Sequence, residues 1–115
     1  MSIDWSTEIA IANLADEPAL SDELGTLTER VEGAGDSPHV VLDFHEVSYV
    51  NSSNIAQLLR MRKLLEEQSR QLVLCSVTDE VMSVLVVSGL NKLFGFAPDT
   101  LTAIASVQIE DSPAS

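Results

Sequence analysis

Two adjacent serines, Ser52 and Ser53, precede a stretch with helical periodicity and are the side chains in this sequence best suited to covalent chemistry. A serine at the start of a helix has two common uses. Its oxygen can cap the helix by accepting a hydrogen bond from a free backbone amide, and its hydroxyl can receive a phosphoryl group from a kinase. Capping is the commoner use, so Asn51 or Ser52 is predicted as the N-cap, and Ser53 is predicted to be structural.

The other reactive side chains predict no catalytic, cofactor or metal site. Cys75, the single cysteine, lies in an apolar run, where a thiol acts as a small apolar filler. His39 and His45 have no partners at metal-ligand spacing, and we assign them to the surface or to loops. Asp43 and Glu46 could form a carboxylate pair, but no nucleophile accompanies them, and the glycine-rich phosphate-binding motifs are absent from the sequence.

Composition and charge narrow the class of partner. The chain has 115 residues, 45% of them hydrophobic, which suits one domain with one core. Its 18 acidic and 6 basic residues give a net charge of −12, which repels nucleic acids and anionic membranes. No apolar run is long enough to span a membrane, and the first residues lack the features of an export signal. We therefore expect a cytoplasmic protein whose partners are proteins with basic patches.

Alternating strand and helix patterns predict the elements that hold these serines. Strands are predicted over residues 7–14, 39–44 and 71–77, with a turn at 90–96 that leads into a last short strand. Helices are predicted over residues 18–33, 54–68 and 79–87, and Thr78 is predicted to cap the third of them. A fourth, terminal helix is predicted to follow an Asp99 cap. The strand–helix–strand order across 39–77 predicts a right-handed crossover. The predicted fold is a single α/β domain with four or five strands in a mixed, mainly parallel sheet and about four helices.

The segment VLDFHEVSYVNSSNIAQLLRMRKLL, residues 41–65, resembles the central motif of the STAS family, the domain of anti-sigma-factor antagonists. In that family a strand of the type VVLDL leads through an apolar pair to a DSSG signature and a helix. The resemblance continues in a GL-x-K-LF segment at residues 89–94, covers residues 39–107 well and covers the first 38 loosely. It implies a STAS domain over residues 1–109, followed by a loose acidic tail at 110–115.

The resemblance also implies a phosphorylation cycle. By motif position, Ser52 corresponds to the first serine of DSSG. In antagonists of the family, that serine is phosphorylated by an anti-sigma factor that is also a serine kinase. The unmodified form binds that kinase and frees the sigma factor, phosphorylation breaks the complex, and a phosphatase resets the cycle. Because a helix N-terminus favours an anion, we expect the phosphate to act on the interface and not to unfold the domain.

Two positions depart from the family motif, since Asn51 stands in place of Asp and Asn54 in place of Gly. The first change removes a carboxylate beside Ser52, and the second adds a side chain where Gly would let a partner backbone approach. The predicted partner surface combines the turn at 49–54 with the exposed side of the next helix. Its residues are Tyr49, Asn51, Ser52, Ser53, Asn54, Gln57, Arg60 and Met61.

Two other interpretations stay open. In one, the chain is an accessory STAS subunit, either a scaffold in a signalling assembly or a partner of a transporter ATPase, and Ser52 is only a cap. In the other, it is a small enzyme, against which the lack of a convergent polar site argues.

Overall fold

β3 (His39–Glu46) is the central strand of a five-stranded sheet in the order β1-β2-β3-β4-β5. The computed structural model describes residues 2–6 and 8–110. β2 (Ile9–Ala15), β3, β4 (Leu72–Cys75) and β5 (Gly95–Ala97) are parallel, and β1 (Ser2–Trp5) pairs antiparallel with β2. The predicted mixed, mainly parallel sheet is confirmed.

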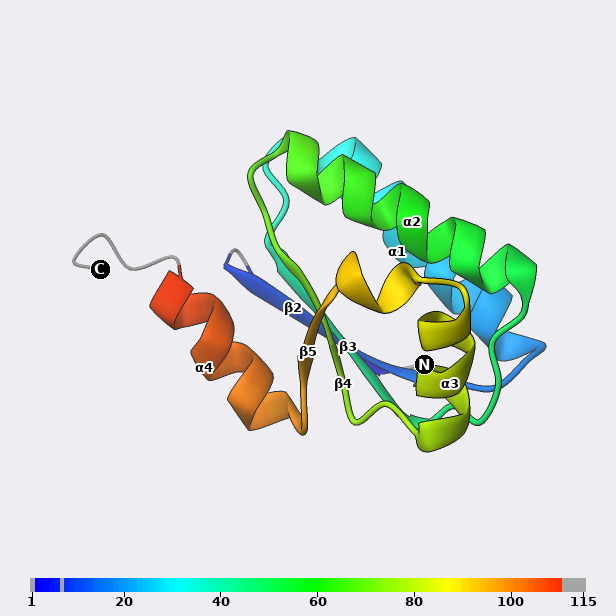
Figure 1. The fold of residues 1–115 in the computed structure, drawn as a ribbon. Helices are drawn as coiled ribbons and strands as arrows, with labels where there is room; N and C mark the ends of the chain where they lie inside the picture. The colour runs from blue at the N-terminus through cyan, green and yellow to red at the C-terminus, as the bar shows by residue number, and fades with distance from the viewer. Residues whose placement is uncertain (1, 7, 111–115) are drawn as a thin grey trace.

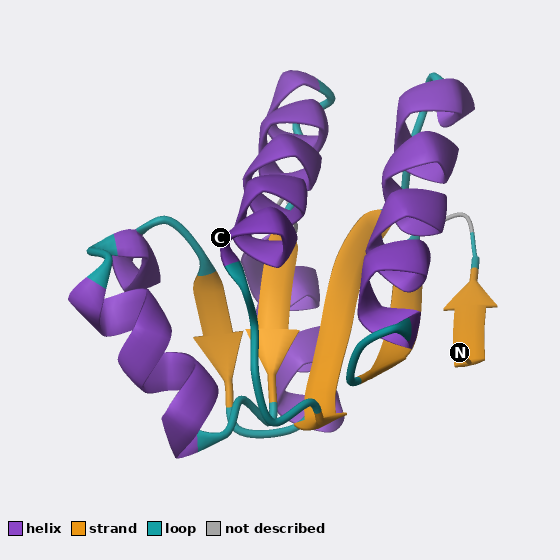
Figure 2. Ribbon diagram, turned by 90° about the vertical axis from the view of Figure 1, so that its right-hand side faces the viewer, coloured by secondary structure: helices purple, strands orange, loops and turns teal. Residues whose placement is uncertain are grey.

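Helices cover both faces of this sheet (Figures 1 and 2). α1 (Ala19–Ala34) and α2 (Ser52–Glu67) pack side by side on one face together with α3 (Asp79–Val87), and α4 (Thr100–Glu110) lies on the other. The 3₁₀ turn η1 (Leu90–Lys92) joins α3 to β5, so a turn is observed within the predicted range 90–96 and leads into a short strand as expected. Four helices were expected and four are seen among the described residues.

The residues of β3 show why this sheet is buried on both faces. Val40, Leu42 and Phe44 join the larger core beneath α1 and α2, whereas Val41 packs toward Ala103 of α4. A strand covered on both sides needs a continuous apolar run and not an alternating one. The run at 39–44 supplies it and thereby places the end of β3, and the turn after it, on a rigid support.

The largest departure from the predicted elements is β1, which the sequence patterns did not indicate. Its four residues, SIDW, are too few to establish an alternating pattern, and they are strand because β2 offers a free edge. The predicted tail at 110–115 begins with Glu110, the last residue of α4, and otherwise lies outside the described residues. Within the described ranges no helix combines the length and hydropathy that a bilayer crossing requires.

His39 was assigned to the surface or a loop, and this is wrong. It is the first residue of β3, is only 3% exposed, and its Nδ1 accepts a hydrogen bond from the Gln71 backbone amide at 3.0 Å. The ring therefore links the starts of β3 and β4. The expectations for Cys75 and His45 are confirmed, because the thiol is buried in the smaller core and the His45 side chain is exposed.

Candidate functional site

The connection between β3 and α2 presents the predicted serines at one edge of the sheet. Val47 and Val50 are buried in the larger core, whereas Ser48 and Tyr49 between them are exposed. The two valines anchor the turn, and the Tyr49 side chain is 61% exposed as a result. The turn is thus held from below and leaves its outer side to the solvent.

Asn51 and Asn54 cap α2 reciprocally. Asn51 Oδ1 accepts a hydrogen bond from the Asn54 backbone amide at 2.8 Å, and Asn54 Oδ1 accepts one from the Asn51 backbone amide at 3.0 Å. Such a capping box satisfies two free amides at once. The N-cap is therefore Asn51, one of the two residues predicted for that position, and α2 begins two residues earlier than expected.

Ser52 is consequently the first residue of α2 and does not cap it. Its side chain is exposed, and its hydroxyl forms no hydrogen bond with any described residue. The commonest structural reason for a serine at this position is thus absent. An exposed, unengaged hydroxyl at the positive end of a helix is accessible to a kinase and is a place where the resulting phosphate is electrostatically favoured.

Two residues of the predicted partner surface are buried and cannot contact a partner directly. Asn54 is 0% exposed because its amide is used in the capping box, and Met61 is 0% exposed because it faces the core. Both assignments are corrected. The remaining predicted residues are accessible or partly so: Tyr49, Ser52, Ser53 and Arg60 are exposed, and Asn51 and Gln57 are half-buried.

Gln57 and Arg60 both link α2 to α1. Gln57 Nε2 donates to the Ser21 backbone carbonyl at 2.9 Å, and the exposed Arg60 guanidinium pairs with Glu32 at 2.7 Å. A partner that docks along this side of α2 therefore also meets the outer surface of α1.

Two acidic residues that the sequence patterns did not single out hold the turn from the β2–α1 loop. Asp16 accepts hydrogen bonds from the Ser48 hydroxyl at 2.6 Å and the Ser48 amide at 2.8 Å, and these bonds lower the pKa of the Asp16 carboxyl. Glu17 accepts from Ser21 and lies 3.4 Å from Asn51 Nδ2. The contacts of Asp16 with Ser48 and of Glu17 with Asn51 join residues more than 30 positions apart, but β2 and β3 are parallel neighbours, so the loops that follow them meet at one sheet edge.

The start of α3 borders the same turn. Thr78 caps α3 as predicted, accepting from the Val81 amide at 3.3 Å, and its hydroxyl also lies 3.4 Å from the Val47 carbonyl. Val81 and Leu85 are buried, whereas Val86 and Val87 are 52% and 88% exposed. The two exposed valines lie on a helix whose N-cap residue contacts the turn.

A second polar cluster lies where β3 and α4 approach each other. Asp43 accepts from His45 Nδ1 at 3.0 Å, and the Thr100 hydroxyl lies 3.4 Å from Asp43 and 3.6 Å from the Cys75 sulfur. The hydrogen bond to Asp43 raises the pKa of His45, while burial raises the pKa of the Cys75 thiol. Cys75 is thus an unreactive filler, and no group of metal-binding side chains is found among residues 2–6 and 8–110.

The His45–Asp43 pair predicts a small pH dependence of stability. Since folding raises the pKa of His45 above 6.5, the pair stabilises the fold below that pH, and the stabilisation is lost as the pH rises through the folded-state pKa. His45→Gln should therefore lower the urea midpoint at about pH 6 and have no effect at about pH 9. Equal midpoint losses at both pH values would contradict an ionic contribution.

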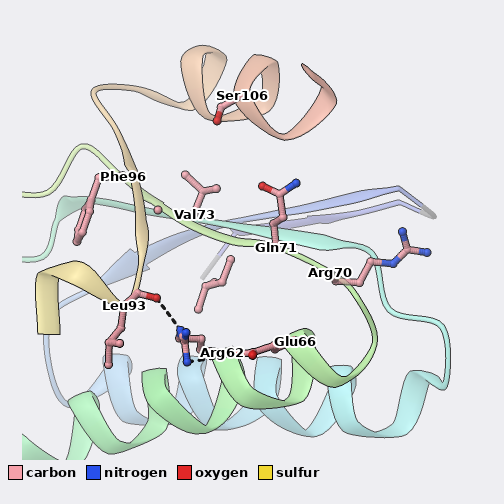
Figure 3. A pocket seen from close by; sticks show the side chains of 10 residues that line it. Arg62, Glu66, Arg70, Gln71, Val73, Leu93, Phe96 and Ser106 are labelled. Carbon is pink, nitrogen blue, oxygen red and sulfur yellow. Dashed lines mark hydrogen bonds and ion pairs between the residues drawn. The ribbon is translucent and has the colours of Figure 1, made fainter. Parts of the chain in front are cut away.

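A separate hollow of about 390 Å³ lies between α2, β4 and α4 and contains none of the predicted site residues (Figure 3). Its two arginines are already engaged. Arg62 Nε donates to the Leu93 carbonyl at 2.6 Å, with Glu66 3.4 Å away, and Arg70 pairs with Asp36 at 3.0 Å. These contacts tie α2 to the segment before β5 and tie the α2–β4 loop to the one before β3.

Comparison with known proteins agrees with this architecture. The STAS domain family model matches residues 10–103. An anti-sigma-factor antagonist (STAS) domain protein from Planctomyces limnophilus is similar in structure, with a TM-score of 0.79, 19% identity, and coverage of 92% of this chain and 96% of that one. The phosphorylated form of the Bacillus cell fate determinant SpoIIAA gives a TM-score of 0.69 at 19% identity, covering 92% and 97%.

A sulfate transporter family protein from Wolinella succinogenes has a TM-score of 0.65 at 20% identity, with coverage of 90% of this chain and 87% of that one. At these identities the structural likeness establishes the fold alone. The family match spans most of the sequence and includes the β3–α2 turn, so the resemblance predicted from the motif is confirmed and the chain belongs to the STAS domain family.

Proposed function

We propose that this chain is an anti-sigma-factor antagonist whose binding to a serine-kinase-type anti-sigma factor is switched off by phosphorylation of Ser52. The proposal rests on the start of α2, where Asn51 and Asn54 cap the helix and Ser52 takes no part in the cap. Ser52 is exposed, and its hydroxyl forms no hydrogen bond with a described residue. The STAS family match supports it, as does the structural likeness to SpoIIAA, an anti-sigma factor antagonist that has been solved in a phosphorylated form. The chain acts by binding, in the cytoplasm, and the catalytic steps belong to the kinase and to a resetting phosphatase.

The docking surface that we propose is centred on this serine. It comprises Tyr49, Ser52, Ser53 and Arg60, and it extends to the exposed valines of α3, Val86 and Val87, which would supply apolar contact area. Phosphorylation adds about −1.5 to −2 charge at neutral pH in the middle of this surface. A closely packed partner would have to desolvate that charge, whereas the free domain leaves it in water at the positive end of α2. The complex, and not the fold, is therefore destabilised.

Incubation with ATP and the serine-kinase anti-sigma factors of the source cell tests the phosphorylation step. Intact mass should show the addition of one phosphoryl group, and peptide mapping should place it on Ser52. Ser52→Ala should abolish the addition, whereas Ser53→Ala, which removes the adjacent exposed hydroxyl, should still give one phosphoryl group that maps to Ser52. Modification that maps to Ser53 would refute the assignment.

The alternative is an accessory STAS subunit, and the likeness to the sulfate transporter family protein favours keeping it. In that case Ser52 is an ordinary exposed residue of the docking surface. A kinase that binds the protein stably but leaves Ser52 unmodified in the presence of ATP would favour this role.

A further inference from the structure

Glu17 lies where the N-termini of α1 and α2 converge. Its carboxylate accepts from the Ser21 hydroxyl at 2.5 Å and the Ser21 backbone amide at 2.6 Å, in the first turn of α1. The same carboxylate is 3.4 Å from Asn51 Nδ2 and 3.5 Å from Asn54 Nδ2, the two amides of the α2 cap. Glu17 therefore contacts both residues that fix the backbone at Ser52.

The negative charge beside the turn at 47–54 comes from Asp16 and Glu17 of the β2–α1 loop. Residues 47–54, VSYVNSSN, contain no charged side chain. Asp16 directs both of its oxygens at Ser48, whereas Glu17 is exposed and reaches the cap itself. Ser21, Asn54 and Asn51 all donate to Glu17 and favour its ionised form, which lowers the pKa of this carboxyl. The cap of α2 thus has one fixed negative charge in contact with it.

We propose that Glu17 is a specificity-determining residue of the Ser52 docking surface, read by a partner that brings an Arg or Lys side chain to the β2–α1 loop. The inference rests on the proposed function, which makes Ser52 the centre of that surface. A basic side chain placed there would gain an exposed carboxylate that is already held in position by its own donors. The docking footprint consequently extends from α2 to a loop that precedes it by more than 30 residues.

The contact with Asn51 also means that positions 17 and 51 exclude each other as sites of negative charge. Asp caps a helix as well as Asn does, so Asn51→Asp alone preserves the capping oxygen. It nevertheless replaces an amide donor with a carboxylate about 3.4 Å from Glu17, where like charges repel. Neutralising Glu17 should remove that conflict and move the charge to position 51.

Four proteins test the inference: wild type, Glu17→Gln, Asn51→Asp and the double variant. Asn51→Asp should lower the urea midpoint in the wild-type background and leave it unchanged in the Glu17→Gln background. With the kinase that modifies Ser52, Glu17→Gln should raise KM about tenfold with kcat nearly constant, and the double variant should return KM to within about threefold of wild type. The matched control is Asp22→Asn, which removes one exposed charge from α1 outside the cap contacts and should leave KM unchanged.

The outcomes separate this inference from the proposed function. Equal KM values for wild type and Glu17→Gln, or an equal rise in KM for Asp22→Asn, would overturn the role of Glu17 while leaving phosphorylation of Ser52 intact. A midpoint loss in the double variant as large as in Asn51→Asp alone would overturn the charge exclusion. Absence of wild-type phosphorylation would overturn the proposed function and the specificity role with it. Restoration of KM in the double variant, beside an unaffected Asp22→Asn, supports the inference.

Discussion

Ser52→Asp should lose the partner protein in a pull-down from the source cell, whereas Ser52→Ala should retain it. Aspartate places a permanent negative charge at the centre of the proposed docking surface, and alanine leaves that surface uncharged. Burying an unpaired charge in an interface commonly lowers the binding free energy by more than about 2 kcal/mol, which is over tenfold in affinity. Quantitative mass spectrometry of the captured proteins measures the difference.

Neither variant should unfold, because the cap of α2 belongs to Asn51 and not to Ser52. Thermal melts of both should lie close to wild type, since exposed substitutions usually change stability by less than about 0.5 kcal/mol and an acid in the first helical turn is favourable. Equal capture by the Ala and Asp variants would remove the phosphorylation switch. Loss of capture with both would indicate that the hydroxyl itself is a contact.

The second large effect is expected from two aromatic residues, Phe44 in β3 and Tyr49 in the turn that follows it. Phe44 is fully buried under α1 and α2, so Phe44→Ala should lower the free energy of unfolding by about 3–5 kcal/mol in urea titrations. Tyr49 is 61% exposed, so Tyr49→Ala should change it by less than about 0.5 kcal/mol. In the pull-down, however, Tyr49→Ala should capture less of the partner than wild type, because an exposed aromatic near Ser52 is a favourable anchor for a partner.

A destabilisation by Tyr49→Ala comparable to that of Phe44→Ala would contradict the arrangement of the turn, in which the valines are the anchors. Retention of full capture by Tyr49→Ala would remove Tyr49 from the docking surface. Because the two substitutions delete similar volumes only five residues apart, each serves as the control for the other.

The sheet and its helices were predictable because their patterns are long and consistent. The apolar run of β3, the cap at Thr78 and the turn before β5 each follow from local chemistry, and each is observed. β1 was missed because four residues at an edge carry too little pattern. His39 was misplaced because a histidine at a strand start was not expected to be buried with its ring on a backbone amide.

The candidate site was predicted in position but not in orientation. The buried stripe of α2 runs through Asn54, Leu58, Met61 and Leu65, and its first member is polar. Asn54 was taken for a surface residue because it is polar, and Met61, which belongs to the apolar stripe, was wrongly assigned to the exposed side of the helix. Asp16 and Glu17 could not be found from local pattern, since their partners lie in another loop that only the parallel pairing of β2 and β3 brings close.

The separation of capping from exposure at the start of α2 has a practical consequence for finding the partner. Position 52 tolerates a new side chain without loss of the cap, and Cys75 is buried with a raised thiol pKa. A cysteine introduced at position 52 would therefore be exposed and would react with thiol reagents in preference to the buried Cys75. A photo-crosslinker attached there would sit at the centre of the proposed docking surface and would label whichever protein covers it.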